Sequence, residues 1–303
     1  MVKRVSRSNE SPESGGPTIS LVLPCFNEAA NLTEVFGKIP SNVNEVLFVD
    51  GGSVDGSVER ALELRPDIRV LTQHAPGKGL ALVIGLLAAT SDIVVMADTD
   101  CSTDLSEMNG FVNSLVAGSD YVKGTRHVSP GGSDDFTIVR RIGNLGLVKL
   151  VNFLYRVKLT DVTYGYGAFW TDTLEHLRLD QILTAAAGAS SSEKRRPRVY
   201  GHGFEIEVLL ACRTAKAGFV VSEIPCHEHL RRHGISKLTV FRDGFRNLHA
   251  ILFERFGPPS RAHRASTFLS DRMAERLERL NARSSENGSV AALNTDDANH
   301  VES

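Results

Sequence analysis

Two carboxylates flank a single residue in the tripeptide Asp98-Thr99-Asp100. The tripeptide follows the apolar run from Ile93 to Ala97, which is typical of a central strand buried on both faces. Paired oxygen ligands at the end of such a strand suit Mg²⁺ or Mn²⁺, and these ions bridge carboxylates to substrate phosphates. A tripeptide of this kind also caps ordinary turns, so its meaning depends on the segments around it.

Three further segments place polar or glycine residues where strands are predicted to end. Asn27-Glu28 follows the first strand, and Asp50 ends the second, before two glycines that let the backbone approach a ligand closely. Pro76-Gly77-Lys78-Gly79 places a cation and free amides at a helix N-terminus, which is a ready anion site. Ligands bind α/β sheets at the carboxyl ends of strands, so the four turns together predict a nucleotide site.

The elements that position these turns alternate between short β-branched runs and amphipathic segments from Thr18 to Arg126. This alternation is the signature of βαβ units, and it predicts an α/β, Rossmann-like fold with a mostly parallel central sheet flanked by helices. We expect strands over residues 19–23, 45–49, 68–72 and 93–97, and helices over residues 27–39, 57–65 and 79–89.

The second half of the chain is richer in helix. We expect helices over residues 137–155, 204–217 and 238–256, and a strand over residues 220–224. The first of these helices is apolar on most sides, which suits either a buried position or a lipid surface. An amphipathic C-terminal helix is predicted over residues 257–283. Residues 185–198 are predicted as a mobile loop, and residues 1–17 and 284–303 as disordered tails.

Bulk properties limit the classes of function. The chain has 303 residues, and its net charge of -2 gives no global reason to expect a nucleic-acid partner. The cysteines Cys25, Cys101, Cys212 and Cys226 are too widely spaced for a zinc or disulfide framework, which fits a reducing cytoplasmic setting. The longest apolar stretch is about half of the roughly 20 residues that span a membrane. We therefore expect a cytoplasmic protein without a transmembrane anchor, with peripheral contact at the inner membrane face left open.

Beyond these patterns, the motifs resemble a known family. PCFNE, VDGGSVDGS, GKGLAL and DTD, in this order, resemble the inverting family 2 glycosyltransferases of GT-A fold. The later segments KGTRHVSPGG, RRIGN, DVTYGYGAFW, GFEIE, EIPCHEHLRRHGISKL and RDGFRNL resemble the dolichol-phosphate mannosyltransferase-like branch. The resemblance implies a GT-A domain over residues 18–256, with a nucleotide-sugar half over residues 18–126 and an acceptor half over residues 127–256.

The resemblance also implies roles for individual residues. The nucleoside pocket would be lined by Pro24, Asn27, Glu28 and Asp50, and Lys78 would lie near the diphosphate. Mg²⁺ or Mn²⁺ would be held by Asp98 and Asp100, with Ser102 as a third ligand. The acceptor phosphate or the closed donor site would be faced by Arg126, Arg140, Arg141, Arg232, Ser236 and Lys237.

Two departures from the family pattern stand out. The usual Asp-Asp-Gly-Ser is Asp50-Gly51-Gly52-Ser53 here, which removes one carboxylate from the nucleoside pocket. His227 and His229 stand where an aromatic residue often precedes the acceptor arginines. These two histidines have two alternative roles: either contacts the metal, or both lie in a solvated loop.

The expected reaction is transfer of a hexose from a nucleotide-diphosphate sugar to a polyprenyl phosphate. A divalent cation contributes several kcal/mol to departure of the nucleoside diphosphate, against about 0.3–1 kcal/mol from a helix N-terminus. The alternative is a soluble acceptor, such as a sugar, a phosphorylated acid or a natural-product hydroxyl. A hydroxyl would need a general base, for which Glu205 or Glu207 is the candidate, whereas a phosphate would not. A non-catalytic nucleotide-binding protein is a further possibility, which the intact DTD and Lys78 disfavour.

Overall fold

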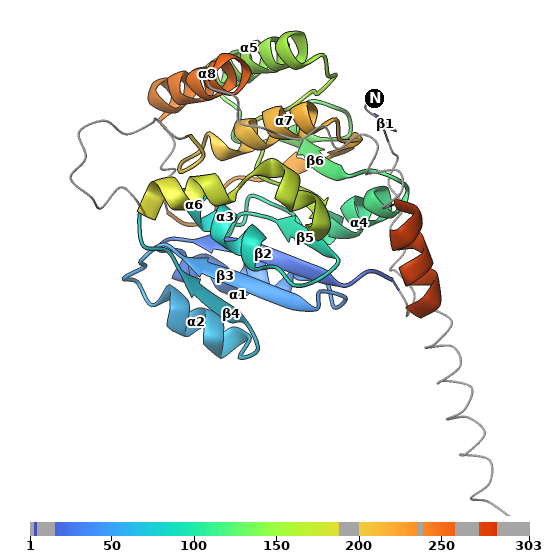
Figure 1. The fold of residues 1–303 in the computed structure, drawn as a ribbon. Coiled ribbons are helices and arrows are strands. Elements are labelled where there is room, and N and C mark those ends of the chain that lie inside the picture. Colours follow the sequence, from blue (N-terminus) through green and yellow to red (C-terminus); the bar gives the residue numbers. More distant parts are fainter. Residues whose placement is uncertain (1–2, 5–15, 188–199, 235–238, 258–272, 284–303) are drawn as a thin grey trace, which may run out of the picture.

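The computed structural model describes residues 3–4, 16–187, 200–234, 239–257 and 273–283. Ser236 and Lys237 lie outside the described residues, as do residues 188–198 of the predicted loop and residues 284–303. Figure 1 shows a layered α/β molecule in which a central sheet lies between two sets of helices.

The main sheet has eight strands in the order β1-β9-β6-β8-β5-β2-β3-β4. Its strands are β1 (Lys3–Arg4), β2 (Ile19–Cys25), β3 (Glu45–Asp50), β4 (Arg69–Thr72), β5 (Ile93–Met96), β6 (Tyr121–Thr125), β8 (Gly167–Trp170) and β9 (Val221–Pro225). Only β8 runs antiparallel to its neighbours, and every other pairing in this sheet is parallel. The prediction of a mostly parallel sheet is therefore confirmed.

Side chains alternate between the two faces of the sheet, as strand geometry requires. Leu47 and Val49 of β3 enter one hydrophobic core, whereas Val46 and Phe48 enter the other. The first core is covered by α3 (Lys78–Ala88), α5 (Ile138–Tyr155), α6 (Asp180–Ala187), α7 (Ile206–Ala217) and α8 (Val240–Phe256). The second is covered by α1 (Ala29–Gly37), α2 (Ser57–Leu64) and α4 (Met108–Val116). Both faces of the sheet are thus buried.

A second, two-stranded parallel sheet pairs β7 (Gly132–Ser133) with β10 (His227–Glu228). Two short 3₁₀ helices are also present, η1 (Leu105–Glu107) and η2 (Thr171–Leu177). In Figure 1, α5 and α8 lie side by side at one end of the molecule, far from α2 and β4.

Most predicted boundaries shift by one or two residues, and three differences bear on the fold. The first helix begins at Ala29 instead of Asn27, because Asn27 has a positive φ of 57° and its side chain accepts a hydrogen bond from the amide of Val54. Lys3–Arg4 pair with β9, although a disordered tail was predicted there, and this pairing covers part of an open sheet edge. Within residues 257–283, the described helix spans residues 273–283.

This last helix packs at the edge of the sheet where β5 and β6 begin. Arg276 forms ion pairs with Asp172 and Asp120, and Arg283 pairs with Asp92. Leu280 packs against the core on the α1 and α4 side of the sheet. The helix therefore lies opposite the edge that carries the candidate site.

Cys25, Cys101, Cys212 and Cys226 are free and buried. Among the residues that the structure describes, no helix is both long enough and apolar enough to cross a membrane.

Candidate active site

The carboxyl ends of β2, β3 and β5 carry the predicted turns, and two cavities meet there. The first has a volume of about 320 Å³ and is lined by residues that include Pro24, Glu28, Gly51 and Gly77. The second has a volume of about 480 Å³ and extends between α5 and α8. Both cavities are lined by the same five residues, which are Lys78, Asp98, Asp100, Phe204 and Arg231.

Lys78, at the first position of α3, lies between two carboxylates. Its Nζ is 2.7 Å from an oxygen of Asp98 and 2.9 Å from Oε1 of Glu207. Burial alone would lower the pKa of Lys78, but Asp98 and then Glu207 outweigh it, so the pKa lies above its usual value. Burial raises the pKa of the Glu207 carboxyl more than Lys78 lowers it. The cluster is a tightly packed group of charges at the junction of the two cavities.

Gly165 leaves the space that the side chains of Lys78, Asp98 and Glu207 occupy. A Cβ atom at Gly165 would lie 2.9 Å from Nζ of Lys78 and 3.2 Å from oxygens of Asp98 and Glu207. Only a residue without a side chain leaves this space open.

The second carboxylate of the DTD motif has different partners. Asp100 Oδ2 lies 2.7 Å from Arg231, whose guanidinium also reaches Glu28 at 3.5 Å. Asp100 Oδ1 accepts hydrogen bonds from the amide and the hydroxyl of Ser102. The predicted metal ligands Asp98, Asp100 and Ser102 thus line the second cavity together.

Arg126 forms part of the wall of the second cavity. Its Nε lies 2.7 Å from buried Asp161, and its Nη1 lies 3.0 Å from Glu228. The guanidinium is also 4.5 Å from the ring centroid of Phe136 and 4.8 Å from that of Tyr164. Its charge is therefore paired, and its plane is fixed from several sides.

The structure separates the other predicted arginines. Arg140 lines the second cavity and pairs with Asp135, whereas exposed Arg141 is not among the lining residues. Arg232 is 64% exposed and pairs with Glu34 on the outer surface of α1. Arg232 is not among the lining residues of either cavity, whereas the adjacent Arg231 lines both.

Two residues predicted for the nucleoside pocket brace turns. Asp50 accepts hydrogen bonds from the amides of Gly52 and Ser53, and Asn27 accepts one from Val54. Neither Asp50 nor Asn27 is among the residues that line the first cavity. Their side chains fix the shape of the loops whose backbone borders the cavity.

The two glutamates before and in α7 have different surroundings. Glu205 is 1% exposed and accepts hydrogen bonds from the amides of Gly201 and Gly203 and from Arg246. Burial alone would raise the pKa of Glu205, but hydrogen bonds from its own amide and that of Gly201, together with Arg246, hold it below its usual value. Glu205 does not line either cavity, whereas Glu207 lines the second. Of the two candidates for a general base, only Glu207 lies at the site.

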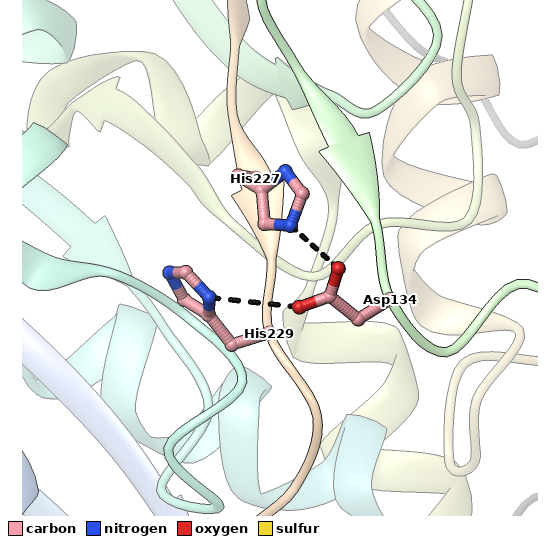
Figure 2. Close-up of side chains that lie close together, drawn as sticks. All are labelled: Asp134, His227 and His229. Carbon is pink, nitrogen blue, oxygen red and sulfur yellow. Dashed lines mark hydrogen bonds and ion pairs between the residues drawn. The ribbon is translucent and has the colours of Figure 1, made fainter.

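His227 and His229 lie beside Asp134, as Figure 2 shows. Nε2 of His227 is 2.9 Å from Oδ1 of Asp134, and Nδ1 of His229 is 3.8 Å from Oδ2. His229 also lines the second cavity.

Sequence reasoning missed Arg231, Asp161 and Gly165. Asp161 and Gly165 belong to the segment DVTYGYGAFW, which carried part of the family resemblance, but no role was assigned to either residue. The adjacent arginines of HLRRHG could not be told apart, because an irregular loop has no periodicity that indicates which side chain faces inward.

Glucosyl-3-phosphoglycerate synthase from Mycobacterium tuberculosis, solved in complex with Mn²⁺, uridine diphosphate and glucosyl-3-phosphoglycerate, superposes with a TM-score of 0.60. The match covers 86% of this chain and 90% of that chain at 22% sequence identity. The molecule therefore has the GT-A glycosyltransferase fold.

Sequence relatives identify the family. A family model for glycosyl transferase family 2 matches residues 20–178. Polyprenol monophosphomannose synthase of Mycolicibacterium smegmatis is 30% identical over 254 residues, which are 78% of this chain and 88% of that protein. Undecaprenyl-phosphate mannosyltransferase of Micrococcus luteus is 28% identical over 228 residues, which are 72% of this chain and 86% of that protein. The chain belongs to glycosyltransferase family 2.

Proposed function

We propose that the protein transfers a hexose from a nucleotide-diphosphate sugar to a polyprenyl phosphate. The observation that carries this proposal is the composition of the second cavity. It is lined by the cations Arg126 and Arg231 and by apolar side chains of α5 and α8, among them Val139, Leu147 and Phe241. Cations beside apolar side chains suit an acceptor with an anionic head and a hydrocarbon chain.

The outer surfaces of the same helices support a membrane-bound acceptor. Ile138, Ile142 and Phe153 of α5 are 65% to 81% exposed, and Phe241 and Phe256 of α8 are 68% to 74% exposed. Contiguous exposed apolar side chains mark surfaces that bind a partner or a lipid. We infer that α5 and α8 rest on the membrane face that presents the acceptor, so that the enzyme acts at the cytoplasmic membrane as a peripheral protein.

The first cavity is proposed to bind the donor. Pro24, Glu28 and Gly51 would border the nucleoside, and Lys78 at the N-terminus of α3 would face the diphosphate. The polyprenyl-phosphate mannosyl enzymes named above support a mannosyl donor.

Asp98, Asp100 and Ser102 would hold a Mg²⁺ or Mn²⁺ ion. Their donor set is made of oxygens only, which is the chemistry that these cations prefer, and all three residues face one cavity. When bound, the cation supplies charge that stabilises the departing nucleoside diphosphate. The structure of glucosyl-3-phosphoglycerate synthase, which has a related fold and contains Mn²⁺ and uridine diphosphate, supports this assignment.

The charge of the acceptor decides whether the protein must supply a general base. A phosphate is already an anion at neutral pH, so Arg231 and Arg126 need only to orient it. The donor and acceptor cavities meet at Asp98 and Asp100, which suits direct attack opposite the departing diphosphate and hence inversion at the anomeric carbon.

A soluble hydroxyl acceptor remains the second candidate function, because Glu207 lies at the junction of the cavities and could accept its proton. The raised pKa of Glu207 places it nearer to the working range of a general base. The alternative is that Glu207 has a structural role, which is to hold Lys78 in place through their ion pair.

A transfer assay separates the two functions. The purified chain with Mn²⁺ and a panel of nucleotide sugars would be offered a polyprenyl phosphate, the matched polyprenol without its phosphate, and phosphoglyceric acid. We expect product only with the polyprenyl phosphate, and loss of turnover in Asp98→Asn and Asp100→Asn. Transfer to phosphoglyceric acid, with none to the lipid phosphate, would refute the proposal in favour of a soluble acceptor. NMR analysis of the product would establish its anomeric configuration.

A further inference from the structure

Two histidines and an aspartate converge at the small sheet, outside the group of charges around Asp98 and Asp100 (Figure 2). We propose that Asp134, His227 and His229 form a second metal site, which takes a divalent transition-metal cation such as Zn²⁺. The metal ligands expected of the donor site are oxygens, whereas this group offers two imidazole nitrogens and a carboxylate.

The distances suit a single ion. One ligand atom from each of the three residues lies within 4.8 Å of the other two. Ligands bound to zinc at roughly 2.0–2.2 Å lie about 3–4 Å from one another, so only small side-chain rotations are needed to close the site. Two imidazoles with one carboxylate form a common ligand set for zinc, and they leave further coordination positions open.

Strand geometry explains why the histidines lie on one side. In His227-Glu228-His229, alternate side chains of an extended segment point to opposite faces. Glu228 accordingly turns away and pairs with Arg126 at 3.0 Å, while both histidines face Asp134. Asp134 follows β7, the strand that pairs with β10, so the ligands come from β10 and from the residues that directly follow the two strands.

The backbone around the ligands is held independently of any ion. The amide of Asp134 donates to the carbonyl of Glu228, and the amide of Gly132 donates to that of Cys226. A Cβ at Gly132 would come within 3.0 Å of the His227 ring, so the glycine leaves room for the imidazole. A preformed backbone reduces the ordering that binding requires.

The position of the site suggests what an ion there would do. His229 lines the proposed acceptor cavity, and its amide donates to the carbonyl of Ser102, next to the DTD motif. A bound cation would therefore add positive charge at the rim of the cavity that the acceptor phosphate enters. All three ligands are at least partly exposed, so an ion can reach them from solvent.

The test measures binding and needs no turnover, so it can fail independently of the proposed function. The full chain, without a histidine tag and stripped with a chelator, would be titrated with Co²⁺ and followed by its visible absorption. Asp98→Asn/Asp100→Asn would serve as the background, because it removes the carboxylates expected to hold the catalytic ion. We expect one equivalent of Co²⁺ to bind to this variant and to be displaced by Zn²⁺.

On that background, His227→Ala and His229→Ala should each weaken Co²⁺ binding by more than about tenfold, since loss even of residues that orient ligands costs about 10–100-fold. His249→Ala, which removes an exposed histidine of α8, is the matched control and should bind as the background does. A rise in melting temperature with Zn²⁺, absent in the two site variants, would exclude misfolding as the cause. Equal Co²⁺ affinity in all variants, or no binding to the background, would overturn the proposal.

Discussion

Each carboxylate of the DTD motif pairs with a different cation, and the two cations come from different halves of the chain. Lys78 holds Asp98, whereas Arg231 holds Asp100. Both cations also border the cavities. Lys78 and Arg231 are therefore already oriented by their ion pairs when a ligand binds there. Preorganised charges of this kind avoid much of the reorganisation that water would require.

Gly165→Ala should damage this arrangement without unfolding the protein. The added methyl group would lie 2.9 Å from Nζ of Lys78, so the lysine must move away from Asp98 and Glu207. We expect kcat/KM for transfer to fall by about tenfold or more, which corresponds to roughly 1.4 kcal/mol. Gly110→Ala on α4 is the control, because its nearest neighbour, in Ile224, is 3.9 Å away. Steady-state kinetics that are equal for both variants would contradict the role given to Gly165.

The adjacent arginines make a second matched pair. Arg231→Ala removes a hydrogen bond to a charged group, worth about 1.5–3 kcal/mol, so kcat/KM for the acceptor should fall by roughly 10- to 100-fold. Arg232→Ala removes only an exposed pair with Glu34, and exposed pairs are worth about 0.2–1 kcal/mol. Its kinetics should stay within a fewfold of the parent. The reverse order of effects would show that the loop binds the acceptor through Arg232.

At the scale of elements, the hydrophobic pattern was sufficient for most of the sheet. The strand predicted for residues 45–49 is β3 (Glu45–Asp50), and the helix predicted for residues 137–155 is α5 (Ile138–Tyr155), capped by Thr137. These boundaries follow from local rules, since a capping hydroxyl and an apolar run act over a few residues. The choice between Glu205 and Glu207 depends on contacts with Arg246 and Lys78 from elsewhere in the chain, which a single sequence does not reveal.

The exposed apolar side chains of α5 predict that this helix binds to membranes. Ile142→Ser with Phe153→Ser should weaken binding to anionic lipid vesicles by about tenfold or more, because burying one such side chain contributes roughly 1.5–3 kcal/mol. Neither residue lines either of the two cavities at the site, so transfer to a short-chain, soluble polyprenyl phosphate should be unchanged. Val54→Ser, which alters a side chain that is 90% exposed in the loop between β3 and α2, is the control. Unaltered vesicle sedimentation of the double variant would show that α5 does not touch the membrane.

At the scale of the whole molecule, we expect the free energy of unfolding to fall at low pH because Asp161 becomes protonated. Burial alone would raise the pKa of Asp161, but Arg126 outweighs it and holds the pKa well below the usual 3.8. The unfolded chain therefore takes up this proton at a higher pH than the folded chain does, and acid favours unfolding. The contribution is complete above the unfolded pKa of about 3.9 and is lost as the pH falls toward the folded value.

Urea unfolding at pH 6 and at pH 3 would measure this dependence. The parent should lose more unfolding free energy between the two pH values than Asp161→Asn, which has no proton to take up at that position. Asp67→Asn changes an exposed carboxylate and should retain the parent's dependence on pH. An Asp161→Asn profile parallel to that of the parent would show that other groups govern acid unfolding.

The reversed direction of β8 determines where the chain can be lengthened. For the parallel strands β2, β3 and β5, the loop that follows the strand reaches the site, and the loop that precedes it lies at the far edge. In β8 this relation is inverted, so the segment from Asp161 to Gly165 enters the site before the strand begins. The segment after Trp170 instead meets the helix of residues 273–283. A designer who grafts new specificity loops would therefore insert after β3 or β5, but before β8.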